Sequence, residues 1–219
     1  MVRPSTGRRL ALGVLFLMCT TAHGGYVDPV TAREWRQVTD TLLIARAEIA
    51  ARCDAISGSC AGSVGTVLLD GWRWASVADV NELFTDFGVP GMATSAPTVS
   101  SLVAGSTWAP AFIDIDGAGP DAGAFDLTLF QSNLTGVVGF TRDLLTTDPT
   151  FAHLGEMLDA TDPAVFDGAR TNASTGIGAR GGSWGFWMYR TVPEPATLPL
   201  ALLAALCGVG LRRTRCSAA

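Results

Sequence analysis

The chain has 219 residues and a mass of 22.8 kDa, with 48% hydrophobic residues, 16% charged residues and a net charge of −5. This length allows one domain rather than two. The composition excludes a disordered chain, a collagen and a polytopic membrane protein. An acidic chain without a single lysine also argues against a nucleic-acid partner. The mean hydropathy is +0.31, and the apolar excess lies at the two ends.

Residues 1–24 are predicted to be a secretory signal peptide. Three arginines precede an apolar run at 10–18, which is shorter than the ~20 residues that a spanning helix needs. Ala22-His23-Gly24 then fits an A-x-A-like cleavage site before Gly25. A twin-arginine signal starting at Arg8 and lipidation at Cys19 fit the neighbouring residues less well, so plain export is the favoured interpretation.

The C-terminal end has three elements: Val192-Pro193-Glu194-Pro195, an uncharged run at 196–211, and the arginines Arg212, Arg213 and Arg215. The two prolines predict a stiff, extended break. The apolar run would form a helix of ~24 Å, short of the ~30 Å hydrocarbon core of a bilayer. The arginines would hold the end of the chain in the cytoplasm. An ordinary membrane anchor is the simplest interpretation.

These elements, in this order and after a signal peptide, resemble the PEP-CTERM sorting signal over residues 192–219. The resemblance implies recognition by an exosortase-type enzyme in a Gram-negative envelope, with transient insertion into the inner membrane and cleavage near the motif. It also implies delivery to the cell surface or the extracellular matrix, so we expect the mature protein to lack residues 196–219. Proteins with this tail vary in their bodies, so the tail indicates a route and not an activity.

The body between the two ends is strongly acidic. Nine of the 15 arginines and 19 of the 20 acidic residues lie in 25–192, which leaves the body with a charge of −10. Such a charge favours solubility and repels anionic polymers.

The body, residues 25–191, is predicted to be a single exported α+β domain with antiparallel strands and two helices. In chain order we expect a strand at 34–39, a helix at 42–53, a strand-to-helix unit at 71–88, and strands at 124–131, 136–142 and 182–190. The segment between the last two strands, 146–180, is predicted to be rich in loops, with one short helix at 150–158.

The strand-to-helix unit has the clearest local pattern. Ser76 is suited to cap the helix, and Asp79 follows three residues later, as in a capping box. Gly88 suits the position just after the last helical turn.

The segment Gly71-Trp72-Arg73-Trp74-Ala75-Ser76 and an aromatic strand ending at Arg190 resemble bacterial C-type-lectin-like domains that carry the sequence GWRLPT. The chain differs from that pattern at Trp74, where the family has leucine, and at Ala75-Ser76, where it has Pro-Thr. The resemblance implies an α+β fold with long loops between its strands.

Cys53 and Cys60 are the only cysteines of the body. Export would take them to an oxidising compartment, where pairing is expected. No histidine lies near them in the sequence, so we predict a structural disulfide rather than a metal or catalytic site.

Asp114, Asp116 and Asp121 lie in a glycine-rich segment whose start resembles a calcium loop. Phe125 stands where an EF-hand would have its closing acid. An acidic turn is therefore favoured, with calcium as the weaker alternative and no other cofactor expected.

His153 is the only histidine outside the predicted signal peptide, which excludes a histidine-rich zinc site. We expect it to be a surface or packed residue. The six tryptophans suit either a carbohydrate platform or core packing, and core packing is favoured. Trp72 and Trp74 are expected on one strand face, and Trp184 and Trp187 on opposite faces.

Together these features predict a non-enzymatic surface or matrix protein with a structural or interaction role in an exopolysaccharide or biofilm matrix. A carbohydrate- or calcium-binding module of lectin-like fold is the alternative. An exported hydrolase is the least favoured, since the residues of common catalytic sites are missing or unpaired.

Overall fold

A computed structural model of the chain describes residues 25–94, 96–103, 108–114, 124–131, 134–160, 166–176 and 184–192. It has a mixed α/β architecture with two larger sheets, which confirms the predicted combination of helices and antiparallel strands. The predicted signal peptide and most of the predicted sorting tail, Pro193 onward, lie outside the described residues.

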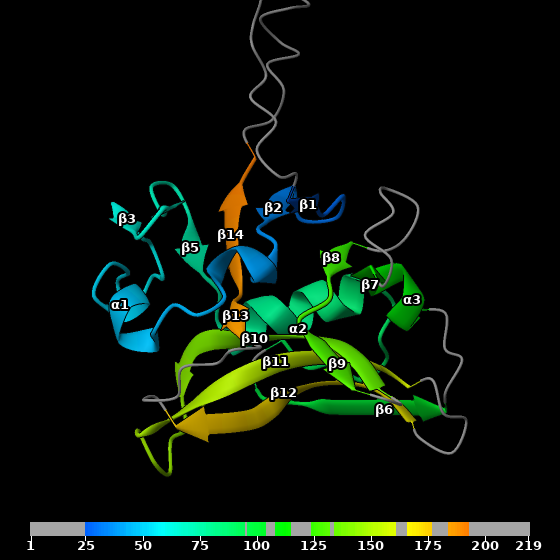
Figure 1. Cartoon of the computed structure of the whole chain (residues 1–219). Coiled ribbons are helices and arrows are strands. Elements are labelled where there is room, and N and C mark those ends of the chain that lie inside the picture. Colours follow the sequence, from blue (N-terminus) through cyan, green and yellow to red (C-terminus); the bar gives the residue numbers. More distant parts are fainter. Residues whose placement is uncertain are drawn as a thin grey trace, which may run out of the picture.

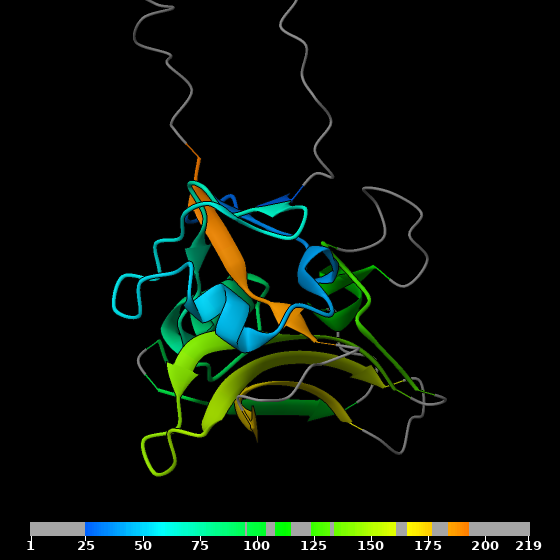
Figure 2. The ribbon, with the colours of Figure 1, turned by 60° about the vertical axis from the view of Figure 1, so that its left-hand side comes forward.

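The smaller of these sheets joins the two ends of the body. Its four antiparallel strands lie in the order β1 (Tyr26–Val27), β2 (Arg33–Trp35), β14 (Met188–Thr191) and β5 (Arg73–Trp74). The first and last strands of the body are thus separated only by β2. Both lie on the same side of the molecule, opposite the larger sheet (Figures 1 and 2).

The larger sheet has six strands and is antiparallel except at one edge. The path runs β13 (Gly185–Phe186), β10 (Leu134–Leu144), β11 (Phe151–Ala160), β12 (Phe166–Gly176) and β6 (Val99–Val103), with β9 (Leu129–Gln131) also paired to β10. The parallel pair is β10 with β13.

Short elements complete the described part of the fold. They are the 3-10 helix η1 (Val38–Thr41), the helices α1 (Arg46–Ala50), α2 (Val77–Asp86) and α3 (Trp108–Phe112), the hairpin β3 (Ser63–Val64) with β4 (Val67–Leu68), and the parallel pair β7 (Ile113–Asp114) and β8 (Phe125–Asp126). Helix α2 packs on β10, β11 and β12 (Figure 1).

The predicted strand-to-helix unit is confirmed in detail. The Asp79 N–H donates to Ser76 Oγ over 3.1 Å, and the Ser76 N–H donates back to Asp79 Oδ2 over 2.8 Å, which closes the capping box. Gly88 has a φ of +86°, the left-handed conformation that glycine adopts most easily after a helix.

The predicted helix at 150–158 is wrong, and so is the loop-rich region around it, because β11 and β12 occupy much of this segment. The three-residue spacing of Phe151, Leu154 and Met157 resembles a helical pattern. In the structure β11 pairs with β10 and β12 on its two sides, so these residues alternate between faces. Tertiary pairing has overridden the local pattern.

Four other predicted elements are shorter or divided. The predicted strand at 34–39 reduces to β2 followed by η1, and the predicted helix at 42–53 reduces to α1. The predicted strand at 124–131 consists of β8 and β9. The predicted last strand is split at Trp187, because β13 joins the larger sheet and β14 the smaller one. Trp187 therefore lies where the chain crosses between the sheets.

Two apolar clusters form the core of the described region. The first core cluster joins both sheets to α2 and consists of Trp35, Val38, Ala75, Val80, Leu83, Phe84, Val89, Trp108, Ala109, Phe112, Ile113, Phe125, Val137, Met157, Ala169, Trp187 and Tyr189. The second core cluster lies on the side of α1 and the disulfide and consists of Ile49, Cys60, Leu69, Trp72, Trp74, Val138, Phe140, Ala152, Leu154, Phe186 and Met188.

Candidate binding cleft

The smaller sheet presents two chemically different faces. Trp35 and Tyr189 are paired across β2 and β14, and both belong to the first core cluster. Their neighbours Glu34 and Arg190, also paired in register, point to the other face because side chains alternate along a strand. At these positions the sheet thus has one face in the core and one polar face, whereas further along the second face Met188 and its partner Trp74 pack in the second core cluster.

A cleft of about 450 Å³ opens where the β3–β4 hairpin meets this polar face. It is lined by Gly25, Glu34, Arg36, Asp40, Thr66, Val67, Leu68, Asp70, Trp72 and Arg190. These residues come from the start of the body, from β2 and the residue after it, from η1, from the hairpin and its flanks, and from the last strand. The cleft thus depends on pairing between distant parts of the chain.

Two arginines cover the ring of Trp72 in this cleft. The guanidinium carbons of Arg36 and Arg190 lie 4.2 and 4.8 Å from its ring centroid, within the range of cation–π contact. Arg36 also donates from Nη2 to the Leu68 carbonyl over 2.8 Å, while its Nε is buried without a hydrogen-bond partner. Burial lowers the pKa of Arg36. The charge of Asp40 acts in the opposite direction, whereas the charge of Arg190 lowers the pKa further.

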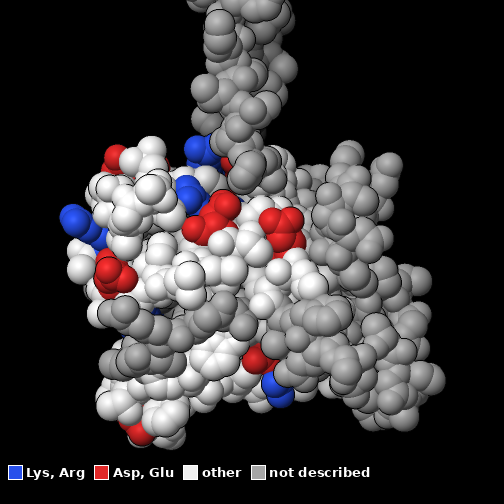
Figure 3. All heavy atoms as spheres, viewed as in Figure 1, with Lys and Arg blue, Asp and Glu red and all other residues white. Residues whose placement is uncertain are grey.

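The charges that line the cleft are largely balanced. Arg190 donates from Nε and Nη2 to the two carboxylate oxygens of Glu34, over 2.7 and 2.8 Å. Asp70 Oδ1 accepts the Gly62 N–H over 2.6 Å. Figure 3 shows charged side chains of both signs close to the point where the chain leaves β14. The cleft therefore offers hydrogen-bond donors and acceptors together, rather than an electrostatic potential of a single sign.

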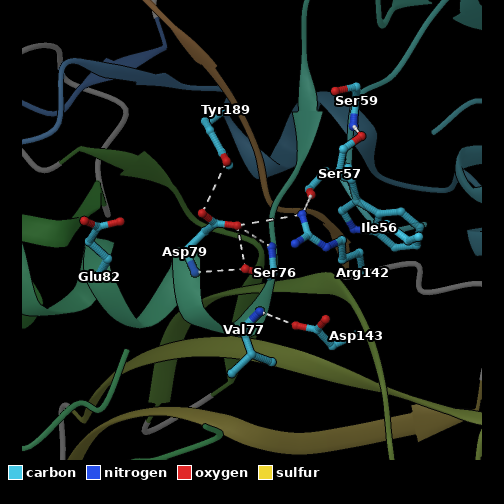
Figure 4. A network of polar contacts seen from close by, with 12 residues as sticks. Ile56, Ser57, Ser59, Ser76, Val77, Asp79, Glu82, Arg142, Asp143 and Tyr189 are labelled. Atoms are coloured by element: carbon cyan, nitrogen blue, oxygen red, sulfur yellow. Dashed lines mark hydrogen bonds and ion pairs between the residues drawn. The ribbon is translucent and has the colours of Figure 1, made fainter. Parts of the chain in front are cut away.

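A second polar network surrounds the start of α2 (Figure 4). Asp79 accepts a hydrogen bond from the Tyr189 hydroxyl over 3.2 Å and forms an ion pair with Arg33 at 3.5 Å. Asp143 accepts the Val77 N–H over 2.5 Å. Burial raises the pKa of Tyr189, and the charge of Asp79 adds to this. These groups satisfy one another at a helix N-terminus, so we assign the network a structural role.

A carboxylate pair lies near the end of α2. Asp28 is only 1% exposed and accepts the Val30 N–H over 2.9 Å. Burial raises the pKa of Asp86 to about 6, and the hydrogen bond and charge of Asp28 and the charge of Glu82 add to this. Sequence reasoning missed this pair because its members are far apart in the chain. No local pattern signals their proximity.

The predicted disulfide is confirmed, since Cys53 and Cys60 are bonded. The Cys60 N–H also donates to the Trp72 carbonyl over 2.9 Å, which ties the disulfide loop to the edge of the cleft. Sequence reasoning did not connect the disulfide with Trp72. It also missed the cleft itself, for which the sequence carries no contiguous signal.

The calcium candidates are not brought together in the described part of the chain. The backbone of Asp114 lies in β7, whereas Asp116 and Asp121 lie outside the described residues. Among the described residues, no group of three or more His, Cys, Asp and Glu side chains is placed to hold a metal ion. His153 is packed, with 8% of its surface exposed.

The tryptophans favour the core interpretation over the carbohydrate platform. Five of the six are at most 7% exposed, and Trp184 is half-buried against the second core cluster. Trp72 and Trp74 lie in the same cluster, as expected of one strand face. Trp184 and Trp187 pack against different clusters, which agrees with their predicted opposite directions.

Of the sorting residues, only Val192 lies in the described region. Its N–H donates to the Ala32 carbonyl over 3.0 Å. Glu194, Pro193, Pro195 and the arginines Arg212, Arg213 and Arg215 lie outside it. Within the described ranges, no helix is both long and apolar enough to cross a membrane.

Comparison with known protein families, with curated proteins and with solved structures gave no match to this chain. The likeness to C-type-lectin-like domains therefore rests on the sequence pattern alone. The site has to be interpreted from its own geometry.

Proposed function

We propose that this chain is an exported cell-surface or extracellular-matrix protein, processed by an exosortase-type enzyme, with a structural or interaction role in an exopolysaccharide matrix. The proposal combines the signal peptide predicted at 1–24 with the PEP-CTERM-like tail at 192–219.

The observation that carries the proposal is that the first and last strands of the described body lie in one sheet, separated only by β2. Val192, the first residue of the sorting motif, is hydrogen-bonded to the body through the Ala32 carbonyl. Strands β1 and β14 lie on the same side of the molecule (Figures 1 and 2). A folded body with this arrangement allows both apolar ends to reach one membrane, with the Pro-Glu-Pro segment at its surface.

The test replaces Pro193, Glu194 and Pro195 with alanine in the full-length chain. We expect the variant to stay uncut in the inner membrane, while the wild-type chain reaches the surface without residues 196–219. A control variant, Thr146→Ala with Thr147→Ala, changes two exposed residues of the body and should be processed normally. Surface delivery of the triple variant at the native mature mass would overturn the proposal.

A lectin-like module is the second candidate, and the cleft beside Trp72 is the observation that favours it. An exported hydrolase would need an acid of raised pKa beside a substrate site. Asp86 has such a pKa, but it does not line the cleft. The non-enzymatic role therefore remains the proposal.

A further inference from the structure

We propose that the cleft beside Trp72 binds a neutral sugar unit, whose adjacent hydroxyl groups would hydrogen-bond to Arg36 and to the carboxylates of the lining. This proposal makes the interaction role proposed above more specific. It rests on that role because the matrix polysaccharide would be the source of the sugar. The contacts that carry it are those of Arg36, Arg190, Glu34 and Asp70.

The size and composition of the cleft suit a small polar ligand. Its volume of about 450 Å³ falls within the ~300–1,000 Å³ typical of small-molecule sites. Val67 and Leu68 provide an apolar wall for the C–H groups of a sugar ring, and Leu68 is 57% exposed. Arginine and carboxylate groups supply most of the remaining lining, together with Gly25, Thr66 and Trp72.

Arg36 is held in place and retains unused donors. Its stacking on Trp72 and its bond to the Leu68 carbonyl fix the guanidinium plane. A guanidinium has five N–H donors in a rigid fork, and the bond to Leu68 uses one of them. Two neighbouring hydroxyl oxygens match the spacing of such a fork, so Arg36 is the residue on which we expect recognition to depend.

The charge balance favours a neutral sugar over a uronic acid. The charge of Arg190 is compensated by a two-point bond to Glu34, and Asp40 and Asp70 also line the cleft. The body as a whole carries −10, which opposes the approach of an anionic polymer. A neutral ligand can instead donate its hydroxyl protons to the carboxylates while it accepts from Arg36.

The cleft should bind weakly, because it lacks an open aromatic platform. Trp72 is 7% exposed, and both arginines lie over its ring, so a sugar cannot stack on it as on a free indole. Hydrogen bonds made in competition with water add only a modest net gain each. We therefore expect dissociation constants of about 1 mM, which a polysaccharide with many repeats would compensate by multivalency.

The experiment measures binding of sugars to the full-length chain in detergent by calorimetry and saturation-transfer NMR. The probes are neutral gluco-, galacto- and manno-oligosaccharides, with oligogalacturonate and oligoalginate as the anionic set. At least one neutral sugar should bind, and Arg36→Gln should weaken it about tenfold. Arg36→Lys should also weaken it, since lysine retains the charge but not the planar fork.

Two further variants keep the result interpretable. Arg170→Gln removes an arginine that pairs with Glu156 outside the cleft, and should leave binding unchanged. If Arg36→Gln lowers stability, Asp70→Asn serves instead, because its amide oxygen can still accept the Gly62 N–H; it should weaken binding about threefold.

Three results would overturn the proposal. One is preferential binding of uronates over neutral sugars, and another is equal binding to the wild-type chain, to Arg36→Gln and to Asp70→Asn. The third is no binding of any neutral sugar at concentrations several times the expected dissociation constant. None of these results bears on processing of the tail. Failure at the cleft is thus distinguishable from failure of the proposed sorting route, which the Pro-Glu-Pro variant reports.

Discussion

Trp187 and Trp72 are both nearly buried, but by different means. Trp187 is 0% exposed and lies among the rings of Trp35, Phe84, Phe112 and Phe125, with centroid distances from 5.4 to 6.3 Å. Trp72 is covered by two arginines. The first arrangement excludes water and joins the sheets, whereas the second leaves polar groups beside a cleft. The difference separates a region that maintains the fold from one able to recognise a ligand.

The strongest test of this contrast is Trp187→Ala. Loss of the ring would leave a cavity between the two sheets and remove the hydrogen bond from its Nε1 to the Gly155 carbonyl, which spans 3.0 Å. We expect the free energy of unfolding to fall by about 3–5 kcal/mol, measured by urea denaturation. Val99→Ala, at an exposed position of β6, should change it by less than about 0.5 kcal/mol. Comparable losses in the two variants would show that Trp187 is not the junction of the core.

The second test acts on the other region, through Cys53→Ser with Cys60→Ser. The chain-entropy model gives a loss of about 2–3 kcal/mol for so short a loop. Hydrogen exchange should rise around α1, the β3–β4 hairpin and Trp72, while β10, β11 and β12 stay protected. Uniform loss of protection would mean that the two regions unfold as one. Mass spectrometry of the exported protein without reductant should find the two cysteines linked.

The smallest expected effect concerns the pH dependence contributed by Asp86. Its pKa in the folded protein is raised from 3.8 to about 6. Ionisation of Asp86 therefore lowers the free energy of unfolding as the pH rises through that window. Asp86→Asn should therefore stabilise the protein at pH 7 by about 1 kcal/mol, after allowance for solvent screening, and by almost nothing at pH 4. The measurement is thermal unfolding at both pH values. An equal gain at both would show that the charge of Asp86 is not the cause.

Local patterns predicted the parts of the fold that depend on neighbours in sequence. The capping box of Ser76 and Asp79 spans three residues, and the disulfide of Cys53 and Cys60 closes a separation of seven. Such features form with little loss of chain entropy, so composition and spacing are enough to indicate them. The strand at β11 was missed because its apolar spacing fits a helix equally well. Only its pairing with β10 and β12 decides between the two.

The candidate cleft could not be predicted for the same reason. Its contacts include Arg36 with Leu68, 32 residues apart, and Arg190 with Glu34, 156 residues apart. Each residue taken alone is an ordinary strand or loop residue. Nothing in the spacing shows that Trp72 would lie beneath two guanidinium groups.

The sequence by itself thus determined the two apolar ends, the acidic body, the capped helix and the disulfide, because each rests on composition or on bonds between near neighbours. The tertiary structure decided which part of the smaller sheet became polar, where the chain crosses between sheets at Trp187, and that β2 meets β14 to form the cleft. Those outcomes depend on which distant strands pair. Strand pairing is governed by the total burial and hydrogen bonding of the folded chain rather than by any local segment.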